Sequence, residues 1–378
     1  MNVRQARGSD ARRCLRRELQ RELFIRYNGQ MSRSTAALIE PHGGTLVEGV
    51  LGPEAAAALA KRAASLPSLA LDAESVADLE LLASGGASPL RGFMSHADYR
   101  SVLERERLAS GTLFPVPLVL PIAVERLGTL PPGTEVALRG ELGELRGTLR
   151  VRDAFVRDLA EARLLHGTDD ARHPAVRRRL AGPAAAISGE VALVRPRGSA
   201  FETAREVRLR LAAEGFYRVA AGLELGIPHG AVEVASHADA LLVRSLAGAA
   251  PIGAQFPVVV ARLPLVRRGL GARETLLNVV VLRNFGVSHV VLGRSIDLAT
   301  AHALLRHGAE LGVTFVHADG ASAGGRATAP REQVPRGNPT PGDATCESAS
   351  SAGWSGPSVT TVGWPRAPAT RRCSTMGR

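Results

Sequence analysis

The strongest constraint on the fold is a change in hydrophobic period near residue 200. From there to residue 317, short apolar runs typical of buried strands alternate with amphipathic segments of helical length. The runs expected to form strands are 218–225, 240–246, 257–264, 288–293 and 313–317. The expected helices are 203–214, 273–285 and 299–311. This alternation predicts a parallel sheet whose strands are joined by helical crossovers.

The predicted sheet also locates a candidate site. Open parallel sheets bind ligands in the crevice at the carboxyl ends of their strands. We therefore expect a site just after Leu225, Pro264 and Gly293, where three of the predicted strands end.

The first 190 residues have a different pattern. Three helical patterns are followed by turn-linked runs typical of strands; the helical ones are 53–65, 74–84 and 97–108, and the strand-like ones are 115–122 and 134–156. Gly85 and Gly86 stop the second helix, and turns are expected at Gly140 and Gly143. The pattern predicts helices decorating a small β-barrel or folded sheet.

The positive charge is concentrated at the two ends of the chain. Of a net charge of +11, residues 1–30 carry +5 and residues 318–378 carry +3. A nucleic-acid-binding protein more often gathers its charge on one folded face. The distribution therefore predicts no nucleic-acid partner.

The terminal segments differ from the middle in other ways. Cys14, Cys346 and Cys373 all lie outside 31–317, so we expect neither a disulfide nor a thiolate metal site in the folded part. No apolar run reaches the roughly 18 residues of a membrane helix, and no secretory signal is recognisable. We predict a cytoplasmic protein with no membrane partner.

Two segments are expected to lie outside the folded part. Residues 1–37 are predicted to be disordered or an over-extended start, with the natural start at Met31. Residues 318–378 are rich in Gly, Ser, Pro, Ala and Thr without periodicity, and are predicted to be a disordered tail.

Three motifs occur in order along the chain. Residues 85–93 read GGASPLRGF, residues 107–117 read RLASGTLFPVP, and residues 170–176 read DARHPAV. In this order they resemble the GG-x-SPL-x-GF, RLADGTLWPIPI and DPxHPxV elements of the sulfate adenylyltransferase (ATP sulfurylase) family. The resemblance covers about residues 38–317.

The resemblance implies a fold and a reaction. The expected fold class is α/β plus β, with a PUA-like N-terminal β-barrel domain at 38–195 and a Rossmann-like nucleotidyltransferase α/β domain at 196–317. The implied reaction converts ATP and sulfate into adenylyl sulfate and pyrophosphate. Mg²⁺ normally accompanies the nucleotide. No metal bound by the protein itself is predicted, and a homo-oligomer is compatible with the resemblance.

The family's main motif, QTRNP-x-HxxH, is largely replaced here. Leu225 stands where the family has the Arg that holds sulfate, and Val232 stands where it has the second His. His229 aligns with the first His and is the candidate catalytic residue. Glu224 adds a carboxylate that would repel anions. The alternative reading of His229 is a loop cap after Pro228.

A second family motif is better preserved. The positions that match it are Arg268, Arg273, Asn284, Gly293 and Arg294. Ser295 and Ile296 replace the family's Asp-His in the nucleotide loop. We expect Arg273 to open a helix and fix packing, and a structural ion pair is the alternative role for Arg294. The predicted nucleotide- or anion-binding residues are Gly293, Arg294 and Arg268.

These observations leave three readings of function. The first is a divergent sulfate adenylyltransferase with degraded site motifs and weak or no activity. The second is a non-catalytic scaffold or oligomerisation module related to fusions with adenylyl-sulfate kinase. The third, nucleic-acid binding through a PUA-like fold, is disfavoured because the middle of the chain is barely basic. No G-x-x-x-x-G-K-[ST] phosphate loop occurs in the chain, so it carries no kinase site of that type.

Overall fold

The structure, a computed structural model, describes residues 37–195, 201–223, 238–243, 256–265, 267–293 and 296–317. All of them fall within one unit of the chain, Met1–Gly325. The predictions of disorder at 1–37 and 318–378 therefore lie outside the described residues, except at Ala37. None of the helices in the described part combines the length and apolarity that a bilayer crossing requires.

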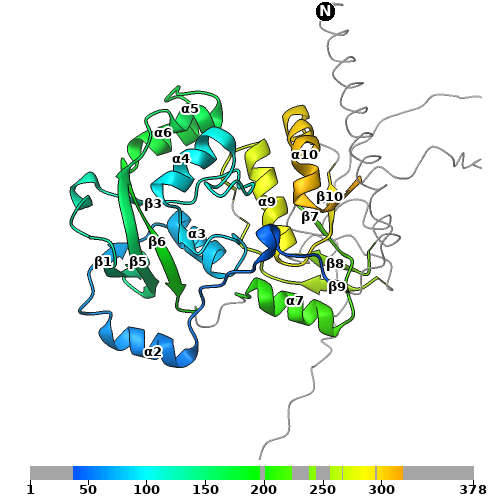
Figure 1. The fold of residues 1–378 in the computed structure, drawn as a ribbon, viewed down its shortest axis with the longest axis horizontal. Coiled ribbons are helices and arrows are strands. Elements are labelled where there is room, and N and C mark those ends of the chain that lie inside the picture. The colour runs from blue at the N-terminus through cyan, green and yellow to red at the C-terminus, as the bar shows by residue number, and fades with distance from the viewer. Residues whose placement is uncertain are drawn as a thin grey trace, which may run out of the picture. The chain divides into compact units, whose positions relative to one another are not determined.

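The N-terminal part is built on a six-stranded sheet (Figure 1). Its strands are β1 (Ser68–Ala70), β2 (Gly92–Phe93), β3 (Leu120–Ile122), β4 (Glu135–Arg139), β5 (Leu145–Val156) and β6 (Ala185–Leu193). The order is β1-β4-β5-β6-β2, and β3 also pairs with β6. Only the β1–β4 pair is parallel. The long antiparallel β5–β6 pair forms the centre of the sheet.

Short helices accompany this sheet. They are η1 (His42–Gly44), α2 (Pro53–Arg62), α3 (Ala73–Ala83), α4 (His96–Arg105), η2 (Val124–Arg126), α5 (Glu161–His166) and α6 (Pro174–Ala181). Asp72 caps α3 by accepting from the backbone N–H of Ser75 at 2.7 Å. The chain leaves α3 through Gly85, whose φ of 84° favours glycine. The predicted helix stop at Gly85 is confirmed.

The C-terminal part contains the predicted parallel sheet. Its strands are β7 (Val219–Gly222), β8 (Ala240–Val243), β9 (Val258–Val260), β10 (His289–Leu292) and β11 (Thr314–His317). They run in the order β11-β10-β7-β8-β9, and every pair is parallel. Its helices are α7 (Ala204–Ala213), α9 (Ala272–Asn284) and α10 (Leu298–Leu311). The predicted change from a β-rich part to a parallel α/β part is confirmed.

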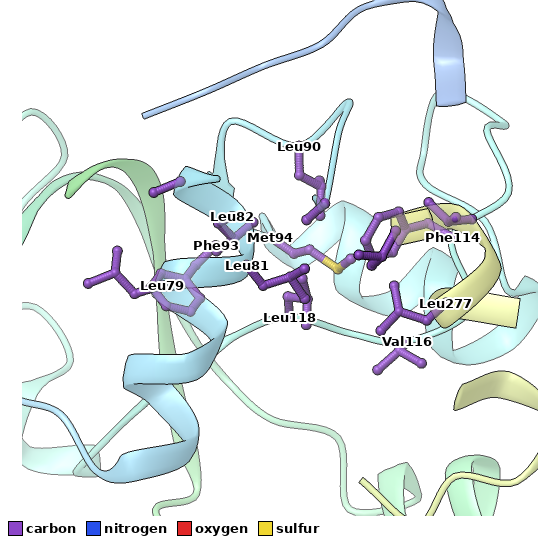
Figure 2. Close-up of a cluster of buried hydrophobic side chains, with 14 of the residues drawn as sticks. Leu79, Leu81, Leu82, Leu90, Phe93, Met94, Phe114, Val116, Leu118 and Leu277 are labelled. Carbon is purple, nitrogen blue, oxygen red and sulfur yellow. The ribbon is translucent and has the colours of Figure 1, made fainter. Parts of the chain in front are cut away.

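The two sheets share one hydrophobic core. Figure 2 shows how side chains of α3 and of the following loop meet Phe114, Val116 and Leu118, with Leu277 of α9 beside them. All of these side chains are buried. Because α9 packs both on its own sheet and on the N-terminal part, the two parts are joined by buried apolar area, which stabilises by roughly 25 cal/mol per Å².

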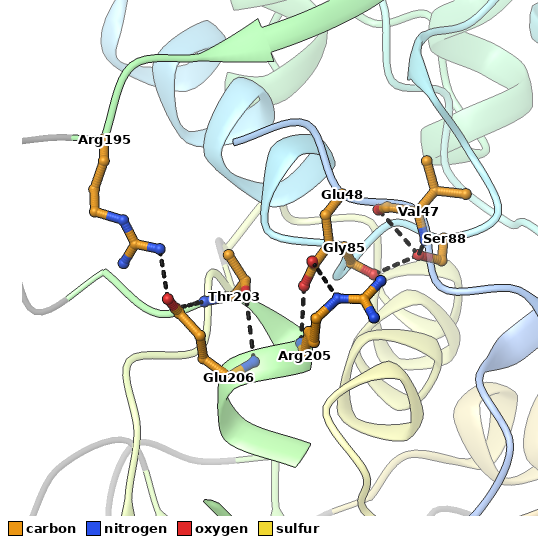
Figure 3. Close-up of polar contacts among 8 residues, drawn as sticks. All are labelled: Val47, Glu48, Gly85, Ser88, Arg195, Thr203, Arg205 and Glu206. Carbon is orange, nitrogen blue, oxygen red and sulfur yellow. Dashed lines mark hydrogen bonds and ion pairs between the residues drawn. The ribbon is translucent and has the colours of Figure 1, made fainter. Parts of the chain in front are cut away.

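Polar contacts reinforce the connection (Figure 3). Glu48 accepts from the backbone N–H of Arg205 at the start of α7 at 2.9 Å and forms an ion pair with its guanidinium at 3.0 Å. The hydroxyl of Ser88 accepts from the backbone N–H of Val47 and donates to the carbonyl of Gly85. Thus the loop after α3 is attached to the segment that precedes α2.

Candidate functional site

The carboxyl edge of the parallel sheet is the first candidate site. Strands β7 and β10 are neighbours, with Gly222 opposite Val291, so the chain leaves both strands at the same edge. Gly293 follows β10 there and is exposed. His229 and Arg294 lie outside the described residues, and so do Glu224, Leu225 and Val232. Their roles at this edge stay predictions.

Arg268 lies in a buried ion pair. Its guanidinium donates to Asp78 Oδ1 of α3 at 2.5 Å and lies 3.8 Å from Glu74. The side chains of Arg268 and Asp78 are 6% and 9% exposed. Burial, the largest single cause, lowers the pKa of Arg268, but the charge and hydrogen bond of Asp78, together with the charges of Glu74 and Glu274, raise that pKa above its ordinary value. The predicted anion-binding arginine thus already has a carboxylate partner from the N-terminal part.

Asn284, another residue of the preserved motif, connects three segments. Its Oδ1 accepts from the backbone N–H of His42 at 2.8 Å, and its Nδ2 donates to the carbonyls of Gly86 and Ser88 at 2.8 and 3.2 Å. The side chain is fully buried at the last turn of α9. A Cβ on Gly86 would lie 2.8 Å from Leu81, so the close packing here favours glycine.

Arg273 anchors the start of α9. Its guanidinium donates to the carbonyls of Val102, Leu103 and Pro115 at 3.0–3.2 Å. The expectation that Arg273 fixes packing is confirmed by these contacts.

A further ion pair joins the N-terminal part to helix α10 of the C-terminal part. The two nitrogens of Arg107 each donate to Glu310 at 2.8 Å, and Glu310 also accepts from the backbone N–H of Leu113 at 2.9 Å. Arg107 and Leu113 belong to the second motif, RLASGTLFPVP. Two of the motifs that signalled the family therefore hold the two parts of the fold together.

His42 is a buried histidine at this interface. Its ring Nε2 lies 2.7 Å from the carbonyl of Leu113, and only 2% of the residue is exposed. Burial, the largest cause, lowers the pKa of His42, and the nearby guanidinium of Arg283 lowers it further. Burial also lowers the pKa of His307 on α10. Both histidines are therefore neutral in the native protein near pH 7.

This burial predicts an acid-sensitive stability. An unfolded histidine titrates near 6.5, whereas the native pKa values are lower, so proton uptake below pH 6.5 favours the unfolded chain. We expect the free energy of unfolding to fall from pH 6.5 towards the lowered pKa values, by up to about 1.4 kcal/mol per pH unit for each histidine. Urea unfolding at pH 7.5, 6.5 and 5.5 measures this free energy. In the His42→Gln variant it should depend less steeply on pH. An unchanged midpoint at pH 5.5 would contradict the argument.

Sequence reasoning did not identify the partners of these motif residues. Asp78, Glu310 and His42 lie 190, 203 and 242 positions from Arg268, Arg107 and Asn284, respectively. The sequence shows that charged residues occur within the motifs, but it does not show which distant residue each of them contacts. Within the described residues, no three His, Cys, Asp or Glu side chains gather in a metal-binding arrangement. The absence of a protein-bound metal stays a prediction.

Comparison with known proteins follows the same division of the chain. The family model of a PUA-like domain matches residues 39–196. A sulfate adenylyltransferase of Symbiobacterium thermophilum is 36% identical over 290 residues, which cover 68% of this chain and 73% of that protein. A probable bifunctional SAT/APS kinase 2 of Sorangium cellulosum is 30% identical, and the match covers 68% of this chain and 49% of that protein.

A solved structure agrees with the fold. The structure described as a hexameric APS kinase from Thiobacillus denitrificans superimposes with a TM-score of 0.52 and 26% sequence identity. The match covers 74% of this chain but only 56% of that one. The chain thus spans little more than half of this structural relative.

Proposed function

The chain belongs to the sulfate adenylyltransferase family, and we propose that it has weak or no turnover of ATP and sulfate. In the family reaction, a sulfate oxygen attacks the α-phosphorus of ATP and the bond to pyrophosphate breaks. Both reactants are anions, so the site must hold donors and positive charge in fixed positions. Mg²⁺ would enter with the nucleotide as part of the substrate.

One contrast carries this proposal. Asn284 and Arg273 keep the family's residue types and are fully engaged in joining the two parts of the fold. At the carboxyl edge, Leu225 and Val232 occupy positions where the resemblance expects an Arg and a His. These two scaffold residues are retained, while two of the residues that the resemblance expects to hold the anions are replaced. Such a pattern favours a family member whose site motifs are degraded.

We expect pyrophosphate release from ATP and sulfate to be at least about 10²–10³-fold slower than for the Symbiobacterium thermophilum relative. Loss of a single preorganised oxyanion donor typically has an effect of that size. The measurement is a coupled pyrophosphate assay on the full chain, with the relative as the positive control. Leu225→Arg combined with Val232→His should recover little. Rapid release that His229→Ala abolishes would overturn the proposal.

The second candidate function is a scaffold or oligomerisation module related to kinase fusions. The similarity to a probable bifunctional SAT/APS kinase and to a hexameric APS kinase favours it. Under this proposal the chain forms a homo-oligomer without turning over substrate. Light scattering on the full chain distinguishes a homo-oligomer from a monomer. A monomer at micromolar concentration would contradict the scaffold role. A cytoplasmic location stays a prediction.

A further inference from the structure

A pocket of about 200 Å³ lies in the N-terminal part of the fold, where the start of α3, helices α5 and α6 and the segment that precedes α9 meet. Neither Leu223 nor Gly293, which follow β7 and β10 at the carboxyl edge of the parallel sheet, lines it. A cavity of about 150 Å³ accommodates benzene, so this pocket has room for roughly eight non-hydrogen atoms. It suits a small metabolite and is too small for a nucleotide.

The wall at the start of α3 is negative. It has three carboxylates and one arginine, namely Asp72, Glu74, Asp78 and Arg268. Arg268 is committed to Asp78 in the buried pair described above and lies farther, at 3.8 Å, from Glu74. Asp72 and Glu74 are exposed at the first turn of α3. This wall therefore has a net charge of −2, and two of its carboxylates are available to a ligand.

The wall formed by residues 157–183 is positive. It has three arginines and one carboxylate, namely Arg157, Arg178, Arg179 and Glu161. Arg157 and Arg179 share the buried carboxylate of Glu161, at 2.5 and 2.9 Å. Arg178 is exposed on α6, and among the residues that the structure describes no carboxylate forms an ion pair with it. Burial lowers the pKa of His166, which also lines the pocket, so its ring is neutral near pH 7 and the wall has a net charge of +2.

The charges of the pocket are thus balanced in number but separated between two walls. Such a pocket is complementary to a ligand that carries one charge of each sign, and not to a simple anion or cation. Much of the remaining lining is apolar, and it includes Val116, Pro117, Val119, Pro121, Leu165 and Leu270. Apolar lining with a few polar groups is typical of small-molecule sites, where the polar groups fix the orientation of the ligand.

We propose that this pocket binds a small apolar α-amino acid in its zwitterionic form. The carboxylate of the ligand accepts from Arg178, its ammonium group donates to Glu74, and its side chain contacts the apolar lining. L-Valine has a matching size and carries both charges near pH 7, so it is the probe. The site is independent of the proposed reaction, because apart from Arg268 none of its lining residues is assigned to ATP or sulfate.

Equilibrium dialysis of the full chain against labelled L-valine at pH 7 tests the proposal. Arg178→Gln and Glu74→Gln each remove one of the two charges that recognise the ligand. Arg177→Gln and Glu54→Gln are their matched controls, because Arg177 is exposed on α6, Glu54 is exposed in the first turn of α2, and neither lines the pocket. We expect each lining variant to bind L-valine at least about tenfold more weakly than its control, since a hydrogen bond between charged groups is lost.

Two analogues of valine separate the roles of its charges. Isovalerate lacks the ammonium group and isobutylamine lacks the carboxylate, so each should displace labelled L-valine at least about tenfold less well than unlabelled L-valine does. In Arg178→Gln, isobutylamine should compete as well as L-valine, because the carboxylate has lost its partner. In Glu74→Gln, isovalerate should compete as well as L-valine for the corresponding reason.

Three results would overturn the proposal. They are no bound L-valine, a lining variant that binds as well as its control, and an analogue that competes with the wild-type chain as well as L-valine. Equal competition by isovalerate would indicate an anion site, and equal competition by isobutylamine would indicate a cation site. The dialysis contains neither ATP nor sulfate, so failure of the proposed function in the pyrophosphate assay would leave this test unaffected.

Discussion

Arg268→Met is expected to lower the free energy of unfolding by about 3–5 kcal/mol. The substitution removes a buried guanidinium and leaves the carboxylate of Asp78, which is 9% exposed, without its partner. Removing one member of a buried pair is strongly destabilising because the other charge stays out of water. Urea unfolding of the full chain, followed by circular dichroism, measures the loss.

Two variants control this result. Arg100→Met breaks an exposed pair with Glu104, whose side chains are 59% and 51% exposed, and should lower the free energy of unfolding by less than about 1 kcal/mol. Arg268→Met combined with Asp78→Leu should be more stable than Arg268→Met alone, because no charge is left buried. If Arg268→Met resembled Arg100→Met, the buried pair would contribute little to joining the two parts.

Asn284→Leu is the second substitution with a large expected effect. The leucine has a similar size but leaves the backbone N–H of His42 and the carbonyls of Gly86 and Ser88 without their partner. Each of the three buried groups left unsatisfied is unfavourable by about 1–3 kcal/mol, so the free energy of unfolding should fall by about 3–9 kcal/mol. The same urea measurement applies.

Thr275→Ala, on the exposed side of the same helix, is the control for Asn284→Leu. Its hydroxyl makes one long contact with the carbonyl of Gly271 at 3.4 Å, so its removal should change the free energy of unfolding by less than about 0.5 kcal/mol. A loss below 1 kcal/mol for Asn284→Leu would show that water or a local shift satisfies the three backbone groups.

Several elements of the N-terminal part were not visible in the sequence. Strand β6 contains Gly189 and has little alternation, and it is a strand because it pairs with β5 along nine positions. In the predicted strand 115–122, only Leu120–Ile122 pairs. Pro115 and Pro117 have no N–H to donate to a sheet. Helices α5 and α6 are short, so their periodicity was too brief to detect.

Local periodicity determined the parallel sheet by itself. Each buried strand and each amphipathic helix encodes its own period, and the right-handed crossover leaves few ways to connect them. Helices α9 and α10 were therefore predicted within one residue of their observed ends. The order of the motifs likewise indicated the family, since that order can be recognised in the sequence without knowing any tertiary contact.

Only the tertiary structure decided what the motif residues do. The sequence shows that Arg268 and Asn284 are present, but their contacts with Asp78 and His42 join positions 190 and 242 residues apart. The strength of a charge or a hydrogen bond depends on burial and on the nearest opposite group, and both arise only when distant segments pack. The same holds for Arg157 and Arg179, which look like ordinary surface arginines in the sequence but share the buried carboxylate of Glu161 in the fold.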